Sequence, residues 1–257
     1  MQHKKIFTCI ILLLFAGCLP GGLPKEKKLK EDKLLFSQAQ KALSARDYMD
    51  AIELFEIFIE RFPDSDGISW AYQRLGESFE GLLQVEYFER MEKGEAECSA
   101  RKEFLARFGT FGCWKESNST LSYNGNHYRH IITKFPDSPI ADEAAYRLVP
   151  RSKDYGGMPD GPLKELKALK QVLEKFPSTS FRPEILYKMA HRCHILYEIY
   201  SFSPDVRLRD KQKAGQYRDK AAYLYKLSFS LPDNSKYSQK AWSGLRSLDE
   251  GKRIYIH

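Results

Sequence analysis

The sequence has only one long apolar run, and that run is too short to cross a bilayer. It extends over residues 6–15, whereas a membrane-spanning helix needs about 20 apolar residues. Low-complexity sequence is also absent, apart from a short charged stretch at residues 25–33. No segment is therefore predicted to span a membrane, and the 42% of hydrophobic residues can form the core of one medium or two small domains.

The sequence also lacks a set of residues with the spacing of a catalytic or metal site. His127 and His130 are one helical turn apart, as are His191 and His194, but no acidic or cysteine ligand stands at a matching spacing. Glu77, in "GESFEGLLQV", faintly resembles the Glu-Ser motif of lytic transglycosylases, although it lies in the middle of a predicted helix. We therefore predict no enzymatic activity, no metal and no cofactor.

The N-terminus has the pattern of an export signal. Lys4 and Lys5 precede the apolar run, and Ala16 and Gly17 come directly before Cys18. Small residues before a cysteine resemble the lipobox of bacterial lipoproteins, which implies cleavage before the cysteine and its acylation. The sequence predicts a signal peptide at 1–17 and lipidation of Cys18; the alternative is an ordinary signal peptide in which this cysteine is incidental.

The residues after the cleavage point indicate a destination and a tether. Leu19 follows the cysteine, where an Asp would suggest retention in the inner membrane, so the lipobox resemblance implies the periplasmic face of the outer membrane. Residues 18–33 are rich in Pro, Gly and mixed charges and are predicted to be a solvated tether. Loss of Lys4 and Lys5 lowers the net charge from +7 to +5, which favours acidic partners or anionic headgroups. Nucleic acid is not an expected target of an exported protein, and no small-molecule substrate is predicted.

Three cysteines remain in the predicted mature domain. Because the periplasm is oxidising, Cys98 and Cys113 could form a disulfide that closes a loop of about 15 residues. The alternative is two unpaired thiols, since connectivity does not follow from sequence. Cys193 lies within a strong helical pattern and is predicted to be a small buried thiol.

A repeated pattern surrounds four prolines. The residues one, four, five and eight positions before each proline are apolar in nearly every case, with one polar exception at Ser228. Such offsets place the side chains on one helical face, and the residue before a proline avoids the α conformation. Each site therefore predicts a helix that ends in a turn, followed by a second helix; the prolines are Pro63, Pro136, Pro177 and Pro232.

The segment before Pro63 resembles a tetratricopeptide repeat. Ala39 and Ala51 stand where that family has small residues, and "RDY" at 46–48 matches its inter-helix turn. One hairpin cannot bury its apolar face alone, so neighbouring hairpins are expected to share a core. The sequence predicts an all-α, TPR-like α-solenoid over residues 34–257, with insertions at about 84–126 and 150–162. The first part of the insertion at 84–126 is expected to be helical, and the remainder, from Gly109, is expected to be a loop. Insertions of this kind either lie at a binding face or have no functional role.

Together, the lipobox, the tether and the "FPDS" repeats resemble the outer-membrane assembly lipoproteins of the BamD type. That resemblance implies a non-catalytic outer-membrane lipoprotein scaffold that binds other envelope proteins in β-barrel assembly. It also implies a groove for an extended peptide lined by Tyr48, Phe55, Trp70 and Tyr72. Two alternatives remain, a division coordinator of the Tol-associated repeat type and a peptidoglycan-active enzyme.

Overall fold

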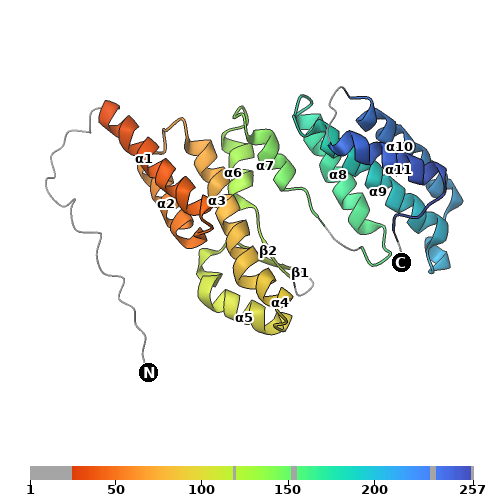
Figure 1. The fold of residues 1–257 in the computed structure, drawn as a ribbon, viewed down its shortest axis with the longest axis horizontal. Coiled ribbons are helices and arrows are strands. Elements are labelled where there is room, and N and C mark those ends of the chain that lie inside the picture. The colour runs from red at the N-terminus through yellow and green to blue at the C-terminus, as the bar shows by residue number, and fades with distance from the viewer. Residues whose placement is uncertain (1–24, 118–119, 152–154, 232–235, 256–257) are drawn as a thin grey trace.

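The computed structural model describes residues 25–117, 120–151, 155–231 and 236–255. The predicted signal peptide, Cys18 and Pro232 lie outside these residues. Helices account for nearly all of the regular structure (Figure 1). In chain order the elements are α1 (Lys25–Ser44), α2 (Tyr48–Arg61), α3 (Ile68–Leu83), a π-helical turn (Gln84–Phe88), α4 (Glu89–Glu92), α5 (Glu97–Phe108), a 3₁₀ turn (Gly109–Phe111), β1 (Trp114–Ser117), β2 (Thr120–Tyr123), α6 (Asn126–Lys134), α7 (Ala141–Arg147), α8 (Asp160–Lys175), α9 (Arg182–Phe202), a 3₁₀ turn (Val206–Leu208), α10 (Lys211–Phe229) and α11 (Lys236–Asp249).

Consecutive helices pack side by side as hairpins, which confirms the all-α, TPR-like prediction. Contacts join α1 to α2, α2 to α3, α3 to α6 and α6 to α7, and then α8 to α9, α9 to α10 and α10 to α11. In Figure 1 the helices follow one another from α1 at one end of the molecule to α10 and α11 at the other. Each hairpin therefore shares its apolar face with the next one along the chain.

Three of the predicted turns have nearly the same backbone. Phe62, Phe135 and Phe176 each end a helix, with φ between −131° and −128° and ψ between 53° and 71°. Two residues after each proline, the backbone N–H of Ser65, Ser138 or Thr179 donates to the carbonyl of that phenylalanine at 3.0–3.2 Å. The residue before each proline avoids the α conformation, so one sequence pattern gives one turn geometry at three places.

The side chains in these turns also connect neighbouring hairpins. The Ser65 hydroxyl donates to Asp32 Oδ2 on α1 at 2.8 Å, and the Thr179 hydroxyl donates to Asp142 Oδ2 on α7 at 2.7 Å. At the middle turn, Ser138 Oγ lies 2.9 Å from Ser69 Oγ on α3. Each turn is therefore joined to the preceding hairpin through a polar side-chain contact.

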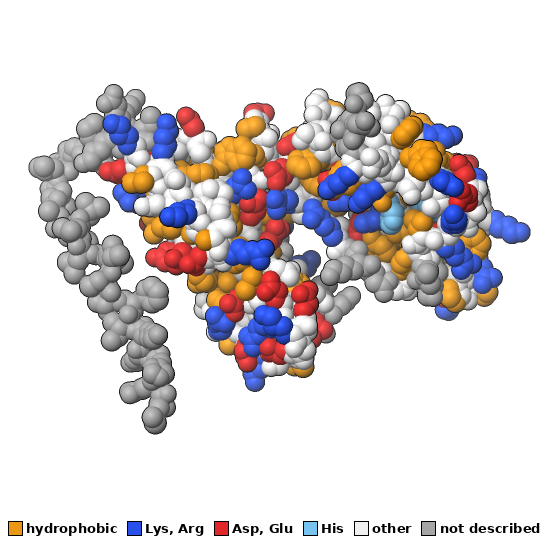
Figure 2. Space-filling view, in the orientation of Figure 1, with side chains coloured by type: hydrophobic (Ala, Val, Ile, Leu, Met, Phe, Trp, Pro, Cys, Tyr) orange, Lys and Arg blue, Asp and Glu red, His pale blue; other side chains and the backbone are white. Residues whose placement is uncertain are grey.

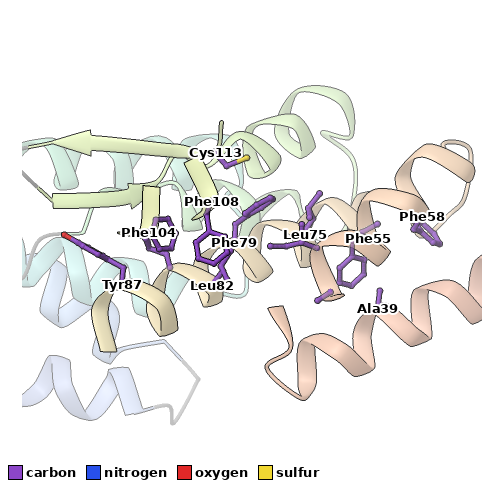
Figure 3. Packing of buried hydrophobic residues seen from close by; sticks show 14 of the residues in the cluster. Ala39, Phe55, Phe58, Leu75, Phe79, Leu82, Tyr87, Phe104, Phe108 and Cys113 are labelled. Atoms are coloured by element: carbon purple, nitrogen blue, oxygen red, sulfur yellow. The ribbon is translucent and has the colours of Figure 1, made fainter. Parts of the chain in front are cut away.

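Apolar side chains fill the space between the hairpins in a row along the solenoid. In the N-terminal half, Ala39 and Ala51 are fully buried, as the repeat resemblance implied for close helix approach. Figure 3 shows Phe55, Phe79 and Phe104 following one another from the first hairpin toward α5. A separate buried cluster lies among α7–α11, and α7 connects the two halves because its Tyr146 belongs to that second cluster.

The predicted boundary of the tether is wrong. Helix α1 begins at Lys25, within the range 18–33 that was expected to be a solvated tether. Lys, Glu and Leu are good helix formers, and the helix is held from outside because Asp32 accepts a hydrogen bond from Ser65 while Glu31 lies 3.5 Å from Arg61.

The expected loop in the first insertion is also wrong in part. Residues 114–117 and 120–123 form an antiparallel hairpin in which Trp114 pairs with Tyr123. Leu121 on its second strand is fully buried, and the Trp114 indole N–H donates to the carbonyl of Phe108 at 2.7 Å. The hairpin exists because it covers the apolar end of α3 and α5, which is a long-range requirement. The helical part of this insertion, including α5, agrees with the prediction.

Candidate functional site

A hollow lies at the N-terminal end of the solenoid. It is a pocket of about 590 Å³ between α1, the end of α2, the turn at Pro63 and the start of α3. Its lining residues are Asp32, Lys33, Phe36, Ser37, Gln40, Phe58, Ser65, Asp66, Gly67, Trp70 and Arg74.

Aromatic rings form the floor of this pocket. The Phe36 ring meets Phe58 edge-on at 5.5 Å and also meets Phe55 edge-on, at 5.6 Å. Trp70 on α3 supplies a further half-buried ring. Such a floor accepts an apolar side chain, because burial of apolar surface is worth about 25 cal/mol per Å².

Charged groups surround these rings. Asp32 and Asp66 contribute carboxylates, while Lys33 and Arg74 contribute cations. Asp32 is held in place by the Ser65 hydroxyl, and Arg74 by an ion pair of 2.6 Å with Glu77. The pocket therefore combines an apolar floor with a polar rim of both signs, which is typical of sites that bind a segment of chain.

Only one of the four predicted groove residues lines this pocket. Phe55 is fully buried in the core, so the expectation that it lines a groove is wrong. Tyr48 packs against Gly81 on α3, and the Tyr72 ring contacts the His130 ring at a tilt, with ring centroids 4.2 Å apart. Trp70 alone is at the pocket, and whether a peptide binds there stays a prediction.

Most of the residues that line the pocket were not predicted from the sequence. Phe36 carried a usable signal, because it precedes the small residue Ala39 by one turn and so shares its face of the helix. Asp32 carried no such signal, because it falls in the range that was predicted to be a tether. Arg74 and Phe58 were treated only as parts of repeat helices.

The structure has the two candidate thiols unpaired, which is the alternative that the sequence left open. Cys98 and Cys113 are both free. Cys98 lies on the exposed side of α5, whereas Cys113 is buried beneath the hairpin, with its thiol 3.3 Å from the carbonyl of Phe111. The helix and the hairpin thus direct the two sulfur atoms to different environments. Cys193 is fully buried, as predicted.

His127 and His194, one from each histidine pair, pack against neighbouring aromatic rings. His127 stacks nearly parallel on Phe79 at 5.4 Å, and its Nδ1 lies 2.6 Å from the Tyr123 hydroxyl. Burial lowers the pKa of His127 to about 4, and the neighbouring His130 adds to this effect. Burial likewise lowers the pKa of His194 to about 4. Within the described residues no group of three or more His, Cys, Asp and Glu side chains could hold a metal ion.

Glu77 belongs to a cluster of ion pairs between α3 and α7. Its carboxylate lies 2.6 Å from Arg74 and 2.6 Å from Arg147, and Arg147 also pairs with Glu143 at 2.9 Å and with Glu80 at 3.2 Å. The geometry therefore gives Glu77 a role in joining two hairpins.

Basic side chains gather at the other end of the molecule. Lys211, Lys213, Arg218, Lys220 and Lys226 are all exposed on α10. Figure 2 shows Lys and Arg side chains spread over this end of the visible face. Residues 207–213 contain the end of a 3₁₀ turn and the start of α10, and Asp210 caps that helix by accepting from the backbone N–H of Lys213 at 2.9 Å. No helix among the described residues has the length and apolar character to span a bilayer.

Comparison with known proteins confirms the predicted resemblance. No protein-family model matches this chain. The sequence is similar to curated proteins named outer membrane protein assembly factor BamD: one from Neisseria meningitidis serogroup A and one from Neisseria gonorrhoeae, each 24% identical, and one from N. meningitidis serogroup B, 23% identical. Each similarity covers 60% of this chain and 67% of the relative.

Proposed function

We propose that this chain is a non-catalytic scaffold in the assembly of outer-membrane proteins. The similarity to proteins named as BamD supports this role, and the helical-repeat fold is suited to binding extended partners. The pocket between α1 and α3 is the proposed contact for a client chain. Its aromatic floor would take one apolar side chain of an extended segment, and its polar rim would face the main chain of that segment.

The observation that carries the proposal is the coincidence of this pocket with that similarity. A strand of an unfolded outer-membrane barrel alternates apolar and polar side chains. A single apolar pocket with a charged rim can accept one apolar side chain of such a strand without requiring a specific sequence. Affinity for one segment would be modest, which suits a scaffold that must release its client.

Crosslinking in intact cells tests the proposal. A photoreactive phenylalanine analogue in place of Trp70 should capture an outer-membrane barrel protein, whereas the same analogue at Trp242, on the exposed face of α11, should not. Capture of a division or Tol component from the Trp70 position would instead support the alternative function and contradict this one.

A matched pair of tryptophan variants tests the pocket itself. Ser37 is exposed and lines the pocket, while its neighbour Gln38 is exposed on α1 and does not. We expect Ser37→Trp to fill the pocket and reduce capture at least fivefold, and Gln38→Trp to leave it unchanged. Equal capture by both variants would show that clients bind elsewhere.

We further propose that Cys18 carries the lipid that holds the chain at the outer membrane. The lipobox pattern of residues 16–18 supports this proposal. Labelling with radioactive palmitate should mark the wild type and should be lost in Cys18→Ser, while Cys98→Ser keeps the label. Retained labelling in Cys18→Ser would contradict the proposed anchor.

A further inference from the structure

The last described residues fold back onto the solenoid. After α11, Gly251 adopts a left-handed conformation with φ of 68°, and the backbone N–H of Lys252 donates to the carbonyl of Ser247 at 2.8 Å. The chain then passes α9 and reaches the loop that precedes α8, so that Tyr255 meets Tyr155 with ring centroids 6.1 Å apart. Figure 1 shows the C-terminus beside this loop. We refer to residues 252–255 as the tail.

A buried carboxylate receives the tail. Glu198 on α9 is only 1% exposed, and its two oxygens accept hydrogen bonds from consecutive backbone N–H groups, Ile254 at 2.7 Å and Tyr255 at 2.9 Å. His194 Nε2 lies 3.4 Å from the same carboxylate. Burial raises the pKa of Glu198, and the two backbone N–H groups act in the opposite direction. The tail therefore supplies donors that a charged buried carboxylate requires.

The inserted loop at 150–162 forms the second half of this contact. The Tyr255 hydroxyl accepts hydrogen bonds from the backbone N–H groups of Tyr155, at 3.3 Å, and Gly157, at 3.1 Å. Gly156 and Gly157 have φ of 55° and 72°, values that L-residues rarely adopt. The loop is itself anchored, because the Tyr155 hydroxyl donates to buried Glu165 at 2.8 Å. Glycine at both positions thus shapes a loop that holds an aromatic hydroxyl.

Two properties distinguish this contact from ordinary packing of a chain end. The tail is recognised through main-chain N–H groups and one tyrosine hydroxyl, which another chain could supply equally well. The tail is also exposed at Lys252 and Arg253 and only partly buried at Ile254 and Tyr255. A segment with few buried contacts opens at a lower free energy than the core.

We propose that Glu198 and the Tyr155–Gly157 loop form a second peptide-binding site, which the tail occupies as an internal ligand. The site takes an extended segment of another protein that presents two successive main-chain N–H groups followed by the hydroxyl of the second residue, a tyrosine. Such a segment binds by displacing the tail. The proposal is independent of the pocket between α1 and α3, since it involves other helices and other residues.

Displacement can be measured with a labelled peptide, EGKRIYIH (residues 250–257), which contains the tail and the residues on either side of it. In the wild type the attached tail competes at an effective concentration in the millimolar range, so the added peptide should bind weakly. The full-length variant Ile254→Pro/Tyr255→Ala lacks one main-chain donor and the hydroxyl in its own tail. We expect it to bind the peptide at least tenfold more tightly than the wild type does, as measured by fluorescence anisotropy.

Two controls make the result specific. A peptide with proline in place of Ile254 should bind the tail-release variant at least tenfold more weakly than the original peptide. Adding Glu198→Gln to that variant should also weaken binding, because an amide has one acceptor oxygen where the carboxylate has two. Equal affinity of the wild type and the tail-release variant for the peptide would overturn the proposal.

A second measurement needs no variant. Hydrogen exchange on the wild type should show protection of the Ile254 and Tyr255 amides, and saturating peptide should accelerate their exchange severalfold. A protein whose tail amides exchange at the same rate with and without the peptide would contradict a displaceable tail, whatever the folding of the variants.

Discussion

The close approach of α2 to α3 depends on a single glycine. A Cβ atom on Gly81 would lie 2.1 Å from the ring of Tyr48, so any side chain must push that ring away. We expect Gly81→Ala to destabilise the protein by about 1–3 kcal/mol, despite the better helix propensity of alanine. Urea unfolding followed by circular dichroism measures the change.

Gly215 on α10 is the matched control for Gly81. It is exposed in a helix, and a Cβ there would have no neighbour within 4 Å. Gly215→Ala should therefore stabilise the protein by about 0.5–1 kcal/mol, the difference in helix propensity. If both variants were stabilised, the contact between Tyr48 and α3 would be less tight than the structure has it.

The neutral histidines predict a loss of stability in mild acid. The pKa values of His127, His191 and His194 are each lowered to about 4, mainly by burial. An unfolded chain has ordinary histidines with a pKa of about 6.5, so between these two values the unfolded state binds more protons. Stability should be complete above about pH 6.5 and should fall progressively toward pH 4.

A histidine variant shows how much of this dependence belongs to one ring. His127→Phe preserves the stacking on Phe79 but cannot take up a proton. Urea unfolding at a series of pH values should give a stability slope smaller than that of the wild type by about one proton between pH 4 and 6.5. An unchanged slope would mean that His127 is protonated in the folded protein.

At the scale of the elements, the polar link between each turn and the hairpin before it contributes to stability. Thr179→Val keeps the shape of the side chain but leaves Asp142 Oδ2 without its donor in a half-buried position. We expect a cost of about 1–3 kcal/mol. A double-mutant cycle with Asp142→Ala should give a coupling energy of about 0.5–3 kcal/mol.

Thr133 provides the control for this link. Its hydroxyl donates to the carbonyl of Arg129 within the same helix, α6, and the side chain is exposed. Thr133→Val should therefore change stability by less than about 0.5 kcal/mol. Similar costs for the two threonine variants would remove the distinction between links within a helix and links between hairpins.

The polar exception in the repeat pattern, Ser228, also makes a polar contact with a neighbouring helix. Ser228 stands on α10 where the other repeats have an apolar residue, and it is fully buried. Its hydroxyl donates to the carbonyl of Pro183 at the start of α9, at 3.1 Å. Pro183 is the second residue of α9, as Ser69 is of α3 and Asp142 is of α7, so a polar contact reaches the same place in three of the repeats.

For the whole molecule, separate cores predict that the two halves unfold in a partly independent way. Phe55 belongs to the N-terminal cluster and Ile185 to the cluster among α7–α11, and both are fully buried. Phe55→Ala should cost about 3–5 kcal/mol and Ile185→Ala about 2–5 kcal/mol. In a repeat protein each loss should act mainly on its own half.

Hydrogen exchange resolved by peptide, at low urea concentration, tests this prediction. Phe55→Ala should reduce protection in α1–α3 much more than in α9–α11, and Ile185→Ala should do the reverse. Equal loss of protection in both halves, for either variant, would show that the solenoid unfolds as one cooperative unit.

The sequence by itself determined the repeated helix–turn–helix units and the character of the faces that pack together. Those features follow from local chemistry, since a proline limits the residue before it and apolar spacing defines one side of a helix. The same local signals located the three turns at Phe62, Phe135 and Phe176. The BamD resemblance also came from these residues, and the comparisons confirm it.

Only the tertiary structure decided which of the apolar residues are available to a partner. Phe55 and Trp70 were both expected to line a groove, yet Phe55 is fully buried, while Trp70 borders the pocket that α1 helps to form. The hairpin at 114–123, the separated thiols of Cys98 and Cys113 and the contact of the tail with Glu198 likewise join segments that are distant along the chain or shielded by others. Burial and long-range hydrogen bonds depend on how every hairpin is stacked, and no single stretch of sequence contains that information.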